Sequence, residues 1–173
     1  MRIPSWVLSL CAASTGFAQT PDLKTPISYA RAVQSQVRGY VERAADKMPE
    51  VQYAFKPDPE VRSFGEVLGH IADAEYLFCS AVLGESNPSP GVEKGKKTKA
   101  EITAAVRAAF AYCDKAYSGI TEAAAAETVK VGNSERNKLG LLSFNTTHGF
   151  EHYGNLVVYM RIKGIVPPSS EPR

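Results

Sequence analysis

Two histidines, His148 and His152, lie four residues apart in a stretch with helical apolar spacing, Leu139–Lys163. At 100° per residue, a helix places both on one face. That face also carries Leu141, Phe144, Asn155, Leu156, Tyr159 and Ile162. A lone histidine on an apolar face is usually a core residue, but two adjacent neutral imidazoles need separate partners, because burying unpartnered polar groups is costly. A metal ion would satisfy both rings, since i, i+4 spacing directs two nitrogens at one point.

The chain contains only one other histidine, His70, and it also lies on an apolar helix face. Three neutral imidazoles leave open positions on a divalent ion for water or substrate. Nitrogen ligands favour zinc or nickel over magnesium or calcium. Such an ion can lower the pKa of bound water or thiol, or polarise a carbonyl. We therefore predict a metal site at His70, His148 and His152, the alternative being separate core histidines.

Four polar residues are candidates to support this site. Asp73, Asn145 and Asn155 each lie three residues from a histidine, on the same helix face. A metal-binding histidine usually donates its second N–H to an acceptor, so we expect at least one of them to approach a ring or the open metal position. The alternative is ordinary helix polarity. Glu151 lies beside the apolar helix face that carries His148 and His152. We expect its carboxylate either to support a metal-binding residue without binding the metal itself or to face solvent.

The first 18 residues are typical of a secretory signal peptide. Arg2 precedes an apolar run, and Gly16 and Ala18 supply the small residues of a cleavage site. The run is too short to span a membrane, and no later stretch could do so. We therefore predict an exported protein, periplasmic or extracellular, with a mature domain of residues 19–173. The alternative is a disordered or amphipathic N-terminus.

The charge balance of the chain restricts its partners. The sequence has 20 Lys and Arg against 18 Asp and Glu, so the mature chain is close to neutral. This balance argues against a nucleic-acid surface and against a polybasic membrane arm. A small-molecule substrate or ligand is the partner that the candidate site predicts. About 155 mature residues are enough for one domain with a core.

Helical spacing and capping residues predict an all-α four-helix bundle. The expected helices, caps included, are Thr25–Met48, Ser63–Gly84, Thr98–Ile120 and Leu139–Lys163. A short extended pair is expected near Thr128, before the last helix. Bundles build metal sites in the core from facing helices, here the second and the fourth.

The remaining segments are expected to be peripheral. Val51–Pro59 is predicted to cover one bundle end, and Glu85–Lys99 to be a mobile surface loop with solvated charges. An alternative role for that loop is a lid over an anionic substrate. Cys79 and Cys113 fall on neighbouring helices, and export would permit a disulfide. Because both lie on or beside apolar faces, the sequence favours two free thiols in the core.

Two runs resemble the DinB-like (DinB/YfiT) four-helix-bundle family. T-H-G-F-E-H-Y-G-N-L-V-V-Y-M-R-I-K-G-I-V-P-P is similar to that family's last helix, and S-F-G-E-V-L-G-H-I-A-D-A-E to its second-helix motif. The resemblance covers essentially the mature chain and implies a divalent metal at His70, His148 and His152. The family often has His-His where this chain has Glu151-His152, and the second of that pair is the usual ligand. The resemblance also implies a homodimer.

Three function classes remain open from the sequence. The first is a metal-dependent hydrolase or transferase acting on a small molecule, and the second is a noncatalytic metal- or ligand-binding module. Some members of the resembled family are transferases or isomerases that use a low-molecular-weight thiol, a reagent that suits an exported protein poorly. The third class is an inverted zinc peptidase, whose H-x-x-E-H motif is matched by H-G-F-E-H. This interpretation leaves His70 without a role. A second acid or base near the metal would favour an enzyme.

Overall fold

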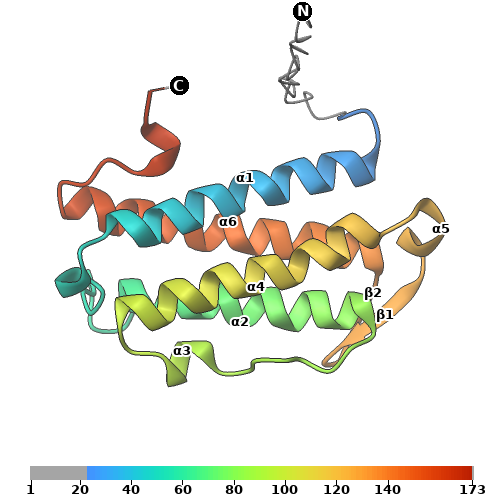
Figure 1. The fold of residues 1–173 in the computed structure, drawn as a ribbon, viewed down its shortest axis with the longest axis horizontal. Coiled ribbons are helices and arrows are strands. Elements are labelled where there is room, and N and C mark those ends of the chain that lie inside the picture. Colours follow the sequence, from blue (N-terminus) through green and yellow to red (C-terminus); the bar gives the residue numbers. More distant parts are fainter. Residues whose placement is uncertain (1–22, 173) are drawn as a thin grey trace, which may run out of the picture.

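Four long helices form the protein (Figure 1). The structure is a computed structural model that describes residues 23–172, and the predicted signal peptide lies outside them. The long helices are α1 (Pro26–Lys47), α2 (Phe64–Leu83), α4 (Lys99–Gly119) and α6 (Lys138–Ile162). They confirm the predicted all-α four-helix bundle. Within residues 23–172, no helix is both long enough and apolar enough to cross a membrane.

Short elements connect and cover the bundle. They are η1 (Glu50–Gln52), α3 (Val92–Gly95), α5 (Glu122–Ala125), β1 (Thr128–Val131), β2 (Ser134–Asn137) and η2 (Pro168–Ser170). Strands β1 and β2 pair antiparallel, with Val131 opposite Ser134. This hairpin confirms the extended pair expected before the last helix.

Local capping explains where the long helices begin and end. At the start of α2, the Ser63 hydroxyl accepts the Glu66 N–H, and the Glu66 carboxylate accepts the Ser63 N–H. Thr98 and Glu101 make the same reciprocal pair at the start of α4. Gly84 ends α2 at φ 71°, a left-handed conformation that glycine adopts without strain. The predicted boundaries, caps included, are therefore correct to within two residues, the largest difference being at the start of α6, whose N-cap is Asn137.

The packing order of the helices brings the histidine-bearing faces together. Helices α1 and α2 each pack against both α4 and α6. The main core between them includes Val37, Val41, Phe64, Leu68, Phe110 and Leu156, all at most 1% exposed. Because α2 and α6 are neighbours, His70 on α2 can meet His148 and His152 on α6.

A disulfide between Cys79 and Cys113 joins α2 to α4. Both residues are fully buried, and their Cα atoms are 5.3 Å apart, a usual separation for a disulfide. The expectation of two free thiols is therefore wrong. Each cysteine does lie on an apolar face, as predicted, but those two faces are turned toward each other across the α2–α4 interface.

Candidate metal centre

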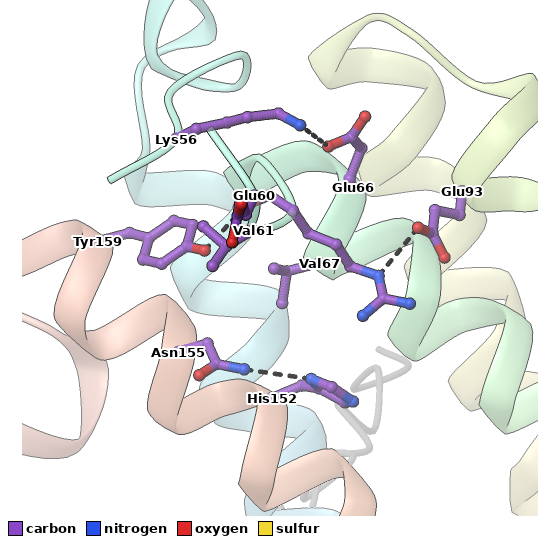
Figure 2. A pocket seen from close by; sticks show the side chains of 10 residues that line it. Lys56, Glu60, Val61, Glu66, Val67, Glu93, His152, Asn155 and Tyr159 are labelled. Atoms are coloured by element: carbon purple, nitrogen blue, oxygen red, sulfur yellow. Dashed lines mark hydrogen bonds and ion pairs between the residues drawn. The ribbon is translucent and has the colours of Figure 1, made fainter. Parts of the chain in front are cut away.

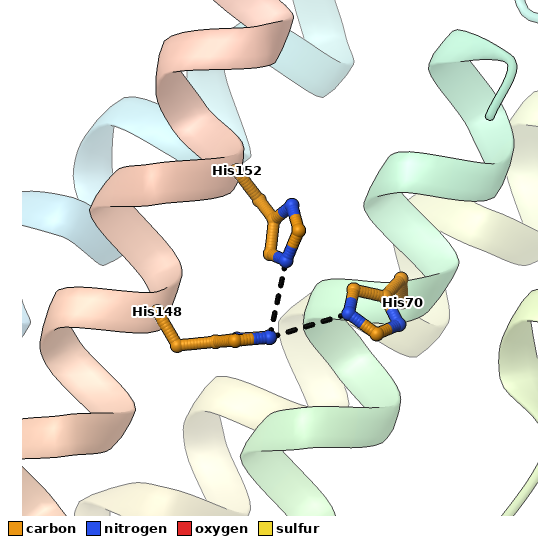
Figure 3. Close-up of side chains that lie close together, drawn as sticks. All are labelled: His70, His148 and His152. Carbon is orange, nitrogen blue, oxygen red and sulfur yellow. Dashed lines mark hydrogen bonds between the residues drawn. The ribbon is translucent and has the colours of Figure 1, made fainter. Parts of the chain in front are cut away.

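The three imidazoles point toward one another between α2 and α6 (Figure 3). The Nε2 atom of His148 lies 3.2 Å from Nε2 of His70 and 3.1 Å from Nε2 of His152. One ring nitrogen from each histidine lies within 4.8 Å of the other two. The i, i+4 spacing on α6 and the α2–α6 contact thus bring together the three predicted ligands.

The environment of the cluster keeps two of these rings uncharged. Burial, followed by the neighbouring imidazoles, lowers the pKa of both His148 and His152 to about 4. At neutral pH each of these rings therefore carries one N–H and one lone pair. Neutral imidazoles are the form in which histidine binds a metal.

Hydrogen bonds among the rings cannot satisfy all three Nε2 atoms. His70 Nδ1 lies 3.2 Å from the Glu93 carboxylate, which favours the His70 proton on Nδ1 and leaves a lone pair on Nε2. His148 Nε2 faces two other Nε2 atoms, but it holds only one proton or one lone pair. A cation can bind all three lone pairs together, so the donor set fits a divalent transition metal.

Glu93 reaches His70 because α3 is fixed against α2. The Asp73 carboxylate accepts the backbone N–H groups of Val92 (2.6 Å) and Glu93 (3.0 Å). Gly69 makes room, since a Cβ there would lie 2.6 Å from Glu93 Cα. Val92 is buried and Glu93 is only 25% exposed at its side chain. The prediction of solvated charges for Glu85–Lys99 is thus wrong at Glu93, which supports a candidate ligand.

Asn155 supports the second ring. Its Nδ2 lies 3.3 Å from Nδ1 of His152, so the structure places one of the three polar candidates beside an imidazole. Rotated by 180°, the same amide would present its carbonyl oxygen and accept the Nδ1 proton. That orientation leaves the lone pair of His152 on Nε2, where a metal would need it.

Asn145 and Glu151 lie outside the cluster. Asn145 is buried and donates to Glu75 Oε2 at 3.1 Å, in the core beside the disulfide. Glu151 is exposed on α6, and it is absent from the lining of the cleft beside His152. Asp73 acts through α3, because its two carboxylate oxygens accept backbone N–H groups of that helix. The structure thus distinguishes Asn155 from Asp73 and Asn145, although sequence spacing had treated these three residues alike.

A polar cleft of about 600 Å³ opens beside His152 (Figure 2). Its lining consists of Lys56, Glu60, Val61, Arg62, Glu66, Val67, Glu93, His152, Asn155 and Tyr159. Outside this lining, the ring centroids of Phe78 and Phe144 lie 5.9 and 6.3 Å from the ring centroid of His148. The candidate centre therefore borders a polar cleft at His152 and aromatic rings at His148.

The residues from the connector after α1 were missed as part of the site. Lys56 belongs to Val51–Pro59, predicted only to cover the bundle end, and Glu60 and Arg62 follow directly after that segment. No periodicity or motif marks them in the sequence. Their role follows from the way the connector folds back over the start of α2, where Gly65 N–H donates to the Tyr53 carbonyl at 2.9 Å.

Comparisons with known proteins agree with this architecture. A family model described as the DinB superfamily matches residues 35–156. A relative from Bacillus subtilis (strain 168), the uncharacterized protein YjoA, is 26% identical over 133 residues, covering 73% of this chain and 84% of the relative.

Two solved structures share the fold. A DinB-like protein from Bacillus cereus ATCC 10987 superposes with a TM-score of 0.72 at 15% identity, over 80% of this chain and 93% of that one. The DinB-like protein YjoA from Bacillus subtilis gives 0.65 at 20% identity, over 82% of this chain and 99% of the other. At these identities the likeness shows the fold alone.

Proposed function

Because the chain belongs to the DinB superfamily, we propose that it is a metalloprotein in which His70, His148 and His152 hold one divalent ion, zinc or nickel. We further propose that it is a hydrolase or transferase for a small molecule. The observation that carries this proposal is the convergence of three Nε2 atoms that hydrogen bonds alone cannot satisfy. Nitrogen ligands favour these two metals over magnesium and calcium.

The residues around the triad have distinct tasks in this proposal. The ion would supply Lewis acidity, lowering the pKa of a bound water or thiol or polarising a carbonyl. Glu93 holds the His70 proton on Nδ1, and Asn155 orients the His152 ring. The cleft admits polar substrate beside His152, while the rings of Phe78 and Phe144 shield the His148 side.

A free carboxylate in the cleft favours an enzyme over a binding module. Glu66 is engaged by the α2 cap and by Lys56 at 3.3 Å. Glu93 is engaged by His70 and by Arg62. The side chain of Glu60 lines the cleft and makes no hydrogen bond or ion pair within residues 23–172. Glu60 is therefore the candidate general base, since an unengaged carboxylate can accept a proton.

The inverted-peptidase alternative receives no support from the position of Glu151. In that motif the Glu is part of the catalytic machinery. Here Glu151 is exposed and lines no part of the cleft, whereas His70, which the motif does not use, is one of the three members of the cluster.

We also propose that the protein is exported. The buried disulfide between α2 and α4 supports this location, because such bonds persist in oxidising compartments. The homodimer stays an expectation from the family resemblance.

The enzymatic proposal is tested by screening small-molecule esters, amides and thiol-transfer substrates with zinc- or nickel-loaded protein. We expect turnover that disappears in the metal-free protein and falls at least about 100-fold in Glu60→Gln, the size expected for a lost general base. Glu50→Gln is a matched control, because Glu50 is an exposed carboxylate at the start of η1, outside the cleft. Full metal loading with no turnover on any class would favour the noncatalytic module.

A further inference from the structure

We propose that the cleft binds a small molecule that bears a carboxylate, with Arg62 holding that group beside the metal. The inference rests on the proposed metal site and specifies the substrate class for it. Four features of the cleft carry the argument: the anchoring of Arg62, its free donors, the charge of the lining and the ligand geometry that a guanidinium prefers.

Arg62 is fixed at both ends of its length. Its Nε donates to Glu93 Oε1 at 2.9 Å, while Oε2 of the same carboxylate lies 3.2 Å from His70 Nδ1. Its backbone carbonyl accepts the hydroxyl of Tyr159 at 2.8 Å. One carboxylate therefore separates the guanidinium from a metal-ligand ring, and the arginine cannot swing away from the cluster without losing that pair.

The guanidinium retains donors for a ligand. Its two terminal amino groups make no hydrogen bond within residues 23–172, and 43% of the side chain is exposed, in the lining of the cleft. A guanidinium presents its N–H groups as a planar fork, which matches the two oxygens of a carboxylate. The free end of Arg62 is thus suited to a planar anion that lies in the cleft.

The charges of the lining make anion binding dependent on the metal. Two basic side chains, Lys56 and Arg62, face three acidic ones, Glu60, Glu66 and Glu93. The lining alone therefore has a net negative charge, which repels anions. When a divalent ion binds to the three neutral imidazoles, the net charge of the cleft and the metal together becomes +1. That charge suits a monoanion such as a carboxylate better than a phosphate, which carries more negative charge and usually needs several basic partners.

The test uses protein loaded with cobalt(II), whose visible spectrum changes when an anion enters its coordination shell. Acetate is the probe, and inorganic phosphate is the comparison. We expect acetate to bind the loaded wild-type protein more tightly than phosphate does, and calorimetry to show no acetate binding to the metal-free protein. In Arg62→Met the acetate Kd should rise about tenfold or more, because a charge-assisted pair is lost.

Arg107→Met is the matched control. Arg107 is 51% exposed and pairs with Asp46 at 2.7 Å, but it lies outside the cleft lining. Its acetate Kd should equal that of the wild type. Arg62→Lys, which keeps the charge but loses the planar fork, should fall between wild type and Arg62→Met. Far-UV circular dichroism and cobalt stoichiometry establish that each variant is folded and loaded.

The possible outcomes distinguish a failure of this inference from a failure of the proposed metal site. If the wild type and Arg62→Met both bind one cobalt ion and have the same acetate Kd, Arg62 is not the recognition group, and the metal site stands. Tighter binding of phosphate than of acetate would overturn the carboxylate assignment. Failure of the wild type to bind cobalt would overturn the metal site and this inference together.

Discussion

Two polar clusters lie inside the same bundle, and they have opposite relations to solvent. Each places three potential metal ligands within 4.8 Å of one another: His70, His148 and His152 in one, Glu75, Cys79 and Cys113 in the other. The histidine cluster borders a cleft of about 600 Å³. The Glu75 cluster, named here for its only carboxylate, is buried throughout.

The chemistry of the donors separates the two clusters further. Both sulfur atoms of the Glu75 cluster are tied in a disulfide and are not thiolates. Glu75 accepts from Gln34 at 2.9 Å and from Asn145 at 3.1 Å, and burial raises its pKa to about 8, so it is largely protonated at neutral pH. The histidine cluster instead keeps neutral rings with unsatisfied nitrogens. Proximity alone does not make a metal site, because the donors must also be deprotonated and accessible.

The largest predicted effect concerns the disulfide. Replacing both cysteines, in Cys79→Ala/Cys113→Ala, should lower the free energy of unfolding by about 2–4 kcal/mol, because the cross-link no longer restricts the unfolded chain. Urea unfolding of both proteins measures this. Metal affinity should not change, since neither cysteine contacts the histidine cluster.

Thiol titration checks the disulfide independently of stability. Unfolded, unreduced mature protein should contain no free thiol, and two free thiols would contradict the structure. A change in metal affinity in the double variant would contradict the separation of the two clusters.

The second prediction concerns the support of His70. Glu93→Ala should weaken metal binding about 10–100-fold, because the ring loses the acceptor that fixes its Nδ1 proton. Competition with a coloured chelator measures this affinity. The matched control is Glu42→Ala, since Glu42 also pairs with an arginine, Arg38, at 2.8 Å but on α1. Equal metal affinities of the two variants would show that Glu93 does not support the metal site and contributes only to the structure of α3.

The two clusters should respond to pH in opposite directions. The folded pKa of Glu75, about 8, is above its usual 4.5, so its contribution to stability is complete below pH 4.5 and is lost as the pH rises to about 8. The pKa values of His148 and His152, about 4, are below the usual 6.5. Their contribution is complete above pH 6.5 and is lost as the pH falls toward 4.

Unfolding of metal-free protein between pH 4 and 9 measures both contributions. Glu75→Gln should remove most of the decline in stability that accompanies the rise from pH 4.5 to about 8, and it should leave the loss that the two histidines cause as the pH falls from 6.5 toward 4. An unaltered decline between pH 4.5 and 8 in that variant would show that another group causes it.

The smallest predicted effect belongs to Glu151. Because its side chain is exposed and outside the cleft, Glu151→Ala should change the free energy of unfolding by no more than about 0.5 kcal/mol. Chelator competition should give the wild-type metal affinity. A loss of affinity comparable with that of Glu93→Ala would place Glu151 in the site after all.

Local signals were sufficient for the helices and for part of the site. Reciprocal capping at Ser63 and Thr98 is encoded within four residues, so the starts of α2 and α4 are readable directly. The pairing of His148 with His152 likewise follows from i, i+4 spacing on a single helix. These features depend on the geometry of one element alone.

Features that depend on how separate elements pack could not be read in this way. Glu93 is 23 residues from His70, in a segment without helical periodicity, and only the close approach allowed by Gly69 brings it in. The cysteine pairing depends on which faces of α2 and α4 meet. The connector residues of the cleft depend on how that segment folds over the start of α2.

The measurement that tests the central claim most directly is elemental analysis of protein purified without added metal. We predict about one zinc or nickel ion per chain in the wild type and loss of most of it in His148→Ala, because two imidazoles hold such an ion far less firmly than three. In the Cys79→Ala/Cys113→Ala protein the metal content should match the wild type. Stoichiometric metal retained in His70→Ala/His148→Ala would contradict the assignment of the ion to the histidine cluster.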